Sequence, residues 1–228
     1  MRKVVKAREL ECFSEFKRKN DPKDWEELDN EISRQLRSHL IQEQEDYCPY
    51  CERHICANTS HIEHIYPRNP KFPLKRIAEK EYDYQNIIAC CKYPKTCGNA
   101  KKNEFHDLFI NPVTEEPRDF LTHDSDEGEL QPLKNNQDGH NYKKAEKTIE
   151  ILNLNEKKLK QARRAWHREL SVLKGTSKEE FSKNLAFLLE FKPKPNFPSI
   201  IQYHLDNYDA FYEKEYERGD SLCQKESY

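Results

Sequence analysis

The sequence predicts an α+β protein that is mostly helical, with a short metal-binding core between two helical regions. Apolar residues recur every three or four positions in residues 24–45 and again after residue 142, which is the pattern of amphipathic helices. Residues 47–103 differ, because they hold six of the eight cysteines and five of the twelve prolines. We therefore divide the chain into an N-terminal helical segment (1–46), a core (47–110), and an acidic linker or hairpin followed by helices (111–228).

Length and composition exclude several classes of protein. The 228 residues contain no run of about 18 apolar residues, so no membrane-spanning segment is expected. The N-terminal residues carry no apolar stretch of the kind found in secretory signals. We therefore expect a cytoplasmic protein with no membrane partner. Its cysteines should be thiols or metal ligands, since reducing compartments do not keep structural disulfides.

The net charge of -2 hides a segregation of charge along the chain. Residues 47–103 carry ten Lys and Arg against five Asp and Glu, and residues 143–168 carry nine against three. Residues 104–142 reverse the balance, with two basic and ten acidic residues. Such runs are often only solvated surfaces, but two basic blocks beside a cysteine cluster favour binding to nucleic acid.

The first predicted helix covers residues 24–45. Asp24 follows Pro22 and is expected to cap this helix, with Glu26 and Glu27 at its positive end. One face of the helix carries the apolar residues Trp25, Leu28, Ile32, Leu36 and Leu40.

The region after residue 110 is predicted to contain a hairpin and four helices. Arg118–Thr122 and Glu129–Leu133 flank a turn at residues 126–128 and suit two short strands. Asn155, followed by Glu156, is the expected N-cap between two consecutive helices. The four helices are expected near residues 142–152, 155–170, 176–189 and 199–217. Between the last two, residues 192–198 are rich in proline and are expected to be extended.

Cys48 and Cys51 are separated by two residues, a spacing at which both sulfurs can turn toward one tetrahedral ion. The same spacing occurs in redox motifs, so the pair alone does not identify a metal site. A structural zinc ion needs four ligands, and Cys90 or Cys91 together with Cys97 can supply the second pair. We therefore predict a structural zinc site, with a redox dithiol or buried thiols as the alternatives.

Residues 60–67 lie between the two halves of this cluster and have the sequence Ser-His-Ile-Glu-His-Ile-Tyr-Pro. In a strand, His61 and Glu63 point to one side and His64 to the other, apart from distortion at the strand end. Two imidazoles and a carboxylate this close together can bind a hard divalent cation while one imidazole stays available as a base. The spacing is not that of the zinc proteases, whose two histidines are four residues apart on a helix.

The order of these motifs resembles that of the HNH endonucleases. Across residues 47–103 the matching motifs are Cys48-x-x-Cys51, His61 to Ile65, Asn86, Cys91 with Cys97, and Lys101. The resemblance implies a ββα-metal nuclease core with a four-cysteine zinc site, flanked here by N- and C-terminal helices. The wider pattern, through residues 148–155, resembles the PtuB-like HNH nucleases of Septu anti-phage systems. It implies a PtuA-like ABC-type ATPase as partner and, where a retron is involved, a reverse transcriptase with its msDNA.

The resemblance assigns the catalytic chemistry to three neighbouring residues. His64 would be the general base that deprotonates a water, and Glu63 would bind Mg²⁺ or Mn²⁺, with His61 as a further candidate ligand. The expected products carry 5′-phosphate and 3′-hydroxyl ends. Several basic residues are expected to contact backbone phosphates: Lys101, Lys102, Arg68, Lys71, Lys75 and Arg76.

The resemblance also assigns the supporting residues. Asn86 would brace the loop that faces the active strand. Asn99 would be the second metal ligand at the start of the helix, displaced by one position because Gly98 follows the last cysteine. The family spacing after Asn86 selects Cys91 over Cys90, so the implied zinc ligands are Cys48, Cys51, Cys91 and Cys97.

Two other functions stay open at this point. A non-catalytic zinc-ribbon module could bind nucleic acid or protein, although such a module has no need of the ionisable pair Glu63 and His64. A zinc hydrolase acting on another substrate would need three protein ligands and an open position, and His61, Glu63 and His64 are packed too closely along one strand to supply them. For a nuclease, the sequence leaves DNA and structured RNA such as tRNA as alternatives.

Overall fold

The structure is a computed structural model that describes residues 1–134, 139–172, 177–190 and 195–209. It combines helices with short strands, as the sequence predicts. The helices are α1 (Glu11–Asn20), α2 (Asn30–Glu43), α3 (Gly98–Lys101), α4 (His140–Leu152), α5 (Lys157–Val172), α6 (Lys178–Glu190) and α7 (Pro198–Asp206). The strands are β1 (Ser60–His64), β2 (Ile87–Cys91), β3 (Leu121–His123) and β4 (Leu130–Pro132). Within the described residues, no helix has both the length and the apolar character needed to cross a bilayer.

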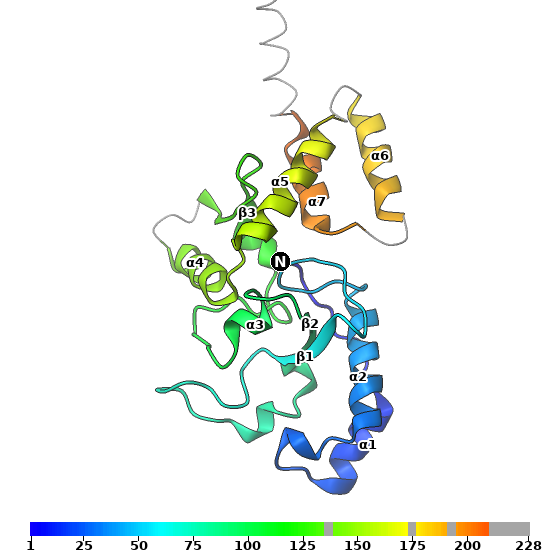
Figure 1. The fold of residues 1–228 in the computed structure, drawn as a ribbon, viewed down its shortest axis with the longest axis vertical. Coiled ribbons are helices and arrows are strands. Elements are labelled where there is room, and N and C mark those ends of the chain that lie inside the picture. The colour runs from blue at the N-terminus through cyan, green and yellow to red at the C-terminus, as the bar shows by residue number, and fades with distance from the viewer. Residues whose placement is uncertain (135–138, 173–176, 191–194, 210–228) are drawn as a thin grey trace, which may run out of the picture.

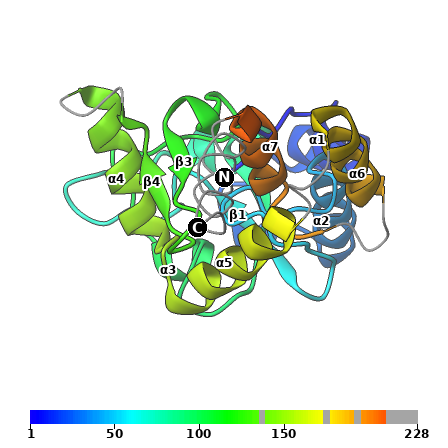
Figure 2. The same ribbon diagram turned by 90° about the horizontal axis from the view of Figure 1, so that it is seen from above.

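β1 and β2 form a two-stranded antiparallel sheet (Figure 1). In its register, His61 lies opposite Cys90. All of β2 is buried, because Ile87–Cys91 is apolar throughout. Helices α2 and α4 lie on opposite sides of this sheet (Figure 2). Gln44, just after α2, pairs its side-chain amide with the backbone of Ala89: Nε2 donates to the carbonyl (2.8 Å) and Oε1 accepts from the N–H (2.7 Å). This contact fixes α2 along the strand.

The predicted N-terminal helix begins later than expected. Trp25–Glu27 form a separate 3₁₀ turn that starts after Asp24. The long helix α2 then begins after Asp29, whose carboxylate accepts from two N–H groups of the first turn. Asp24 is therefore the cap of this short turn, in a capping box with Glu27, whereas Asp29 caps the long helix. The break between turn and helix lets Trp25 pack against the end of β1, at His64.

The hairpin predicted for residues 118–133 is present, although its strands β3 and β4 are shorter than expected. Asn155 does not cap α5. Its side-chain amide pairs with the backbone of Leu130, donating to the carbonyl (2.9 Å) and accepting from the N–H (2.9 Å). The cap is Glu156, whose carboxylate accepts from two N–H groups of the first turn of α5. Asn155 therefore fastens the hairpin to the helix.

The C-terminal helices are attached to the cysteine-rich turn through Glu52. The carbonyl of Glu52 accepts from the Phe197 N–H (2.9 Å), and its carboxylate accepts from the Ser199 N–H (2.8 Å). Figure 1 shows α5, α6 and α7 together at the end of the molecule away from α1. Helix α7 ends at Asp206. The predicted helix start at 176, residues 192–194 of the proline segment and the predicted end of the last helix near 217 lie outside the described residues. The described part of the proline segment is not extended as far as 198, because Phe197 has a positive φ of 58° and Pro198 begins α7.

Candidate active site and zinc centre

Four buried cysteines form one cluster, in which all sulfur atoms lie within 4.8 Å of one another: Cys48, Cys51, Cys91 and Cys97. The Cys51–Cys91 and Cys48–Cys97 sulfur pairs are 3.7 and 3.9 Å apart. A tetrahedral zinc ion with bonds of about 2.3 Å spaces its sulfurs by about 3.8 Å. The donor set and its spacing therefore fit a structural zinc ion, and the cluster contains Cys91 rather than Cys90.

Local backbone geometry brings these cysteines together. The turn after Cys48 closes with a hydrogen bond from the Glu52 N–H to the carbonyl of Cys48 (2.8 Å). Cys97 has a positive φ of 55°, and its N–H donates to the carbonyl of Leu152 at the end of α4 (2.8 Å). Cys90 has a different role, because its sulfur accepts a hydrogen bond from the Gly98 N–H (3.3 Å). It therefore supports the start of α3.

The cluster is able to carry negative charge. Burial opposes the ionisation of Cys48, but hydrogen bonds from the neighbouring thiols outweigh it and hold the Cys48 pKa well below its usual value. Metal ions bind thiolates and release the remaining thiol protons. The chemistry of the cluster therefore suits a cation.

His61 and Glu63 lie on one face of β1, as expected for alternate residues of a strand. His61 Nε2 is 3.4 Å from Glu63 Oε2, a spacing at which one divalent cation can contact both atoms. Burial opposes the ionisation of Glu63, but the contacts with His61 and Lys101 outweigh it and lower the Glu63 pKa. The carboxylate is therefore ionised at neutral pH and available to a cation.

Lys101 holds this carboxylate from α3. Its side chain is fully buried, and its Nζ is 2.8 Å from Glu63 Oε1 and 2.9 Å from the carbonyl oxygen of His64. The two oxygens of Glu63 thus face different partners, Lys101 on one side and His61 on the other. Because the ammonium of Lys101 does not reach solvent, the prediction that it contacts backbone phosphates is corrected: it positions Glu63.

His64 ends β1 and is 7% exposed. Its Nε2 lies 3.0 Å from the carbonyl oxygen of Glu81. Because a carbonyl can only accept, Nε2 carries the proton and Nδ1 carries the lone pair of the neutral ring. Trp25 packs edge-on against this ring, with centroids 4.6 Å apart. Burial lowers the pKa of His64 to about 4, so the imidazole is neutral at pH 7 and can accept a proton at Nδ1, although this pKa lies below the working pH at which a general base is most effective.

Asn86 connects the end of β1 to the segment that precedes β2. Its Oδ1 accepts from the Tyr66 N–H (2.7 Å), and its Nδ2 donates to the carbonyls of Tyr66 (3.0 Å) and Lys80 (2.8 Å). The side chain therefore holds both ends of residues 66–80, which link the two strands.

The structure does not bring Asn99 to the carboxylate of Glu63. The Asn99 amide donates to the carbonyl of Tyr93 (3.1 Å). The residue that faces the carboxylate–imidazole pair is Gly98, where an added Cβ would lie 2.8 Å from Glu63 Oε2 and 2.9 Å from His61 Nε2. Successive residues of a helix point about 100° apart, so Asn99 cannot share the direction of Gly98. We therefore leave Asn99 out of the ligand set.

Most of the basic residues predicted to bind phosphates are paired with acidic side chains. The pairs are Arg68–Glu26 (2.6 Å), Lys71–Glu104 (3.3 Å), Arg76–Asp24 (2.6 Å) and Arg76–Glu81 (2.6 Å). Lys75 and Lys102 are exposed and form no ion pair with any residue that the structure describes. Exposed ion pairs are weak, so Arg68 and Lys71 can exchange their partners for phosphates. Arg76 is held more firmly, because its partner Glu81 is buried.

Comparison with known proteins gives one informative match. No model of a known protein family matches the chain. The chain is 27% identical over 152 residues to a protein of Vibrio cholerae serotype O1 biovar El Tor named "Retron Vc95 putative HNH endonuclease". The match covers 64% of this chain and 70% of that protein. This similarity supports a relationship to the HNH endonucleases, which are nucleases.

Three residues of the site were not identified from the sequence: Trp25, Glu81 and Gly98. Trp25 fits the apolar face of the predicted helix, and nothing local shows that the helix breaks after it. Glu81 acts on His64 through its backbone carbonyl, which every residue type carries. Gly98 did have a signal, since a glycine directly after the last cysteine is a position where the backbone can approach other groups closely.

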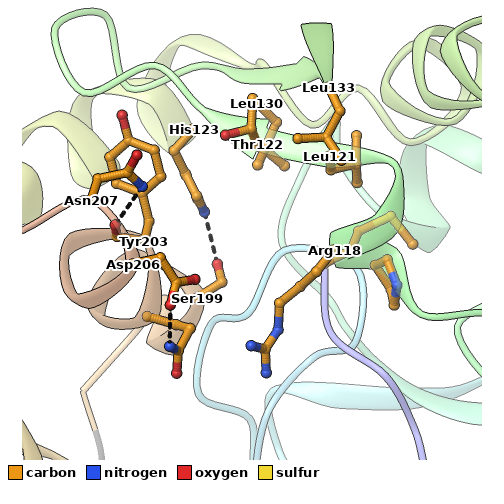
Figure 3. A pocket seen from close by; sticks show the side chains of 13 residues that line it. Arg118, Leu121, Thr122, His123, Leu130, Leu133, Ser199, Tyr203, Asp206 and Asn207 are labelled. Atoms are coloured by element: carbon orange, nitrogen blue, oxygen red, sulfur yellow. Dashed lines mark hydrogen bonds between the residues drawn. The ribbon is translucent and has the colours of Figure 1, made fainter. Parts of the chain in front are cut away.

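A separate pocket of about 260 Å³ lies between the β3–β4 hairpin and α7 (Figure 3). His123 Nε2 lies there, 2.8 Å from Ser199 Oγ. Burial holds the pKa of His123 well below its usual value, so the ring is neutral. The candidate zinc ligands and the candidate catalytic residues do not line this pocket, which is therefore distinct from the candidate active site.

Replacing Gly98 by alanine should weaken binding of a divalent cation, because the new methyl group would push Glu63 and His61 apart. We expect at least a tenfold loss of Mn²⁺ affinity for Gly98→Ala, measured by titration calorimetry on the zinc-loaded protein. Asn99→Ala is the matched comparison and should bind Mn²⁺ within about twofold of the wild type. A large loss in Asn99→Ala with none in Gly98→Ala would restore Asn99 as the ligand.

Proposed function

We propose that this protein is a metal-dependent HNH endonuclease that hydrolyses phosphodiester bonds of nucleic acid. The observation that carries the proposal is the neutral, tautomer-fixed imidazole of His64 at the end of the strand that also holds the His61–Glu63 pair. A base one residue along the strand from a candidate cation site supplies the two elements that metal-assisted phosphodiester hydrolysis needs. The order of the motifs and the similarity to the Vibrio cholerae protein support this function.

In this proposal, His64 acts on the attacking water. Its Nδ1 takes a proton as the water oxygen bonds to phosphorus, while the Nε2–H stays bonded to the carbonyl of Glu81. In the part of the chain that the structure describes, no hydrogen bond occupies Nδ1. The bond between phosphorus and the 3′ oxygen breaks, the leaving oxygen takes a proton from solvent, and the products carry a 5′-phosphate and a 3′-hydroxyl.

Glu63 Oε2 and His61 Nε2 would hold the catalytic cation. Two protein ligands suit Mg²⁺ or Mn²⁺, which keep waters or phosphate oxygens in the rest of the coordination shell. When bound, the cation neutralises charge at the scissile phosphate. Lys101 keeps Glu63 in place for this task, and Gly98 keeps side-chain atoms away from the two ligand atoms.

The proposal is tested by incubating the purified protein with plasmid, single-stranded DNA, total RNA and tRNA, in Mg²⁺, in Mn²⁺ and in EDTA. We expect cleavage of at least one substrate that needs the divalent ion. Glu63→Gln, which removes the ligand charge, should lower the rate by at least a hundredfold. Glu79→Gln is the matched control, because Glu79 is exposed and lies outside the site.

The zinc-ribbon binding module makes a different prediction in the same experiment. It would bind zinc and nucleic acid but cut none of the four substrates in any metal. Cleavage at equal rates by the wild type and Glu63→Gln would also contradict the proposed active site, because the activity would then belong to another site or another protein.

The pH dependence of cleavage follows from the lowered pKa of His64. The base works in its unprotonated form, and with a pKa of about 4 that form persists to lower pH than for an ordinary histidine near 6.5. We therefore expect kcat/KM at constant Mn²⁺ to change little between pH 8 and pH 5.5 and to fall only as the pH approaches 4. An acid limb centred near pH 6.5 that does not move when the Mn²⁺ concentration is raised, and so does not come from protons competing for His61, would show that the working base is a solvated histidine.

We further propose that the nuclease is the effector of an anti-phage defence complex with a PtuA-like ABC-type ATPase. The proposal rests on the resemblance to PtuB-like proteins and on the retron origin stated in the name of the Vibrio cholerae relative. Affinity purification of the tagged chain from its own host should recover such an ATPase in stoichiometric amount. A retron association would add a reverse transcriptase and msDNA to the same complex, and recovery of the chain alone would contradict this proposal.

A further inference from the structure

Phe72 is the most exposed large apolar side chain among the described residues, with 95% of its surface open to solvent. It lies in segment 67–77, which Figure 1 shows reaching away from the sheet. A hydrogen bond from the Leu74 N–H to the carbonyl of Lys71 (3.1 Å) closes the turn that carries Phe72. A single exposed apolar residue is common on proteins and indicates nothing by itself. Phe72 is of interest because the segment that carries it is attached to the candidate active site.

Segment 67–77 is attached at both ends to elements of the candidate active site. The Lys71 N–H donates to the carbonyl of Asn103 (3.1 Å), directly after the helix whose buried lysine holds the metal-binding carboxylate. Arg76 Nε donates to Glu81 Oε1 (2.6 Å), and the carbonyl of Glu81 holds the candidate base. Both ends of the segment that carries the exposed ring are therefore attached to the candidate active site.

The charges around the ring favour a polyanion as the partner. Lys75 is exposed, and no described residue forms an ion pair with it. Lys71 contacts Glu104 at 3.3 Å in an exposed pair, which a phosphate can displace. Segment 67–77 itself contains no acidic residue; of the two glutamates that follow it, Glu81 is buried and bonded to Arg76, and Glu79 is exposed. A flat apolar ring between two exposed lysines suits a chain of phosphates with attached bases.

We propose that Phe72 stacks on an unpaired base next to the cleavage position, so that the preferred substrate is single-stranded or locally unpaired nucleic acid. Both faces of a base inside a duplex are covered by its neighbours, whereas an unpaired base offers a free face to an aromatic ring. Phenylalanine has no hydrogen-bonding atoms, so this contact would select unpaired structure without reading base identity. The inference rests on the proposed nuclease function and names its substrate class.

The test measures binding separately from cutting. The full chain carrying His64→Ala is titrated into a fluorescent single-stranded oligonucleotide and into the matching duplex, and binding is followed by anisotropy. Base stacking on an aromatic side chain contributes a factor of about 5 to 150 in affinity. Adding Phe72→Ala should therefore weaken single-stranded binding by that factor and reduce the preference for single strands over duplex. Phe72→Trp should keep the preference, and the new indole fluorescence should be quenched on binding.

Phe187→Ala is the matched control, because Phe187 on α6 is also a largely exposed aromatic residue, at 60%. It should leave the preference unchanged. Equal single-stranded binding by Phe72→Ala and its parent, or an unquenched indole in Phe72→Trp, would overturn the inference even if the wild type cuts nucleic acid. If instead the wild type cuts nothing but Phe72 still determines single-stranded binding, the nuclease proposal fails and the stacking contact stands.

Discussion

Replacing His64 by alanine should reduce cleavage by about 100- to 10,000-fold, which is the usual contribution of a general base. The substitution removes the Nδ1 atom that we propose takes the proton from the water, while Glu63, His61 and Lys101 stay in place. Mn²⁺ binding should therefore be retained. The measurement is a single-turnover cleavage assay with the substrate that the wild type cuts.

Three controls make this result specific to the base. His54→Ala removes an exposed histidine outside the site and should cut at the wild-type rate. Thermal melting shows whether loss of the buried ring has unfolded the protein, and His64→Asn is a second, polar replacement for that case. Added imidazole should partly restore cleavage by His64→Ala if the space left by the ring admits it. A folded His64→Ala protein that cuts at the wild-type rate would remove His64 from the mechanism.

The second large effect is expected at the cysteine cluster. Cys48→Ser should abolish stoichiometric zinc binding and prevent the core from folding, since structural zinc supplies about 10–16 kcal/mol of apparent binding free energy in small zinc domains. The cluster joins the turn after Cys48 to β2 and to the segment before α3, and its loss would release Lys101 and Gly98 from the site. Zinc content by elemental analysis and the circular dichroism melting curve measure the two consequences.

The neighbouring cysteines provide matched controls. Cys56→Ser alters an exposed thiol outside the cluster and should keep the zinc ion and the stability. Cys90→Ser should also keep the zinc ion, because the Cys90 sulfur bonds to the Gly98 N–H and lies outside the group of four. Loss of zinc in Cys90→Ser but not in Cys91→Ser would reverse this assignment. Full zinc content and stability in Cys48→Ser would rule out the structural site.

The sequence predicted those parts of the fold whose cause is local. The hairpin at residues 118–133 follows from a turn between alternating residues, and α4 follows from regular apolar spacing after Tyr142. The pairing of His61 with Glu63 on one face of β1 follows from strand geometry alone. The grouping of Cys91 with the other three cysteines needed the family resemblance, since spacing left Cys90 equally possible.

The parts that the sequence did not predict depend on contacts between distant segments. Trp25 has the same apolar spacing whether the helix starts before or after it, and its separate turn is held by contacts with distant residues, among them the rings of His64 and Tyr82. The sequence around Lys101 is that of an ordinary surface lysine. Its ammonium pairs with the carboxylate of Glu63 only because α3 lies close to β1 in the fold. Asn99 matched a ligand position by type but is rotated away, because α3 presents Gly98 to the site.

The most direct test of the account is the position of a divalent ion and a phosphate in crystals of His64→Ala with Mn²⁺ and an uncleaved oligonucleotide. We expect the anomalous signal of manganese beside Glu63 Oε2 and His61 Nε2, with one phosphate oxygen as a further ligand and the phosphorus near the space vacated by the imidazole. Manganese at another site, or a phosphate bound away from β1, would contradict the proposed active site.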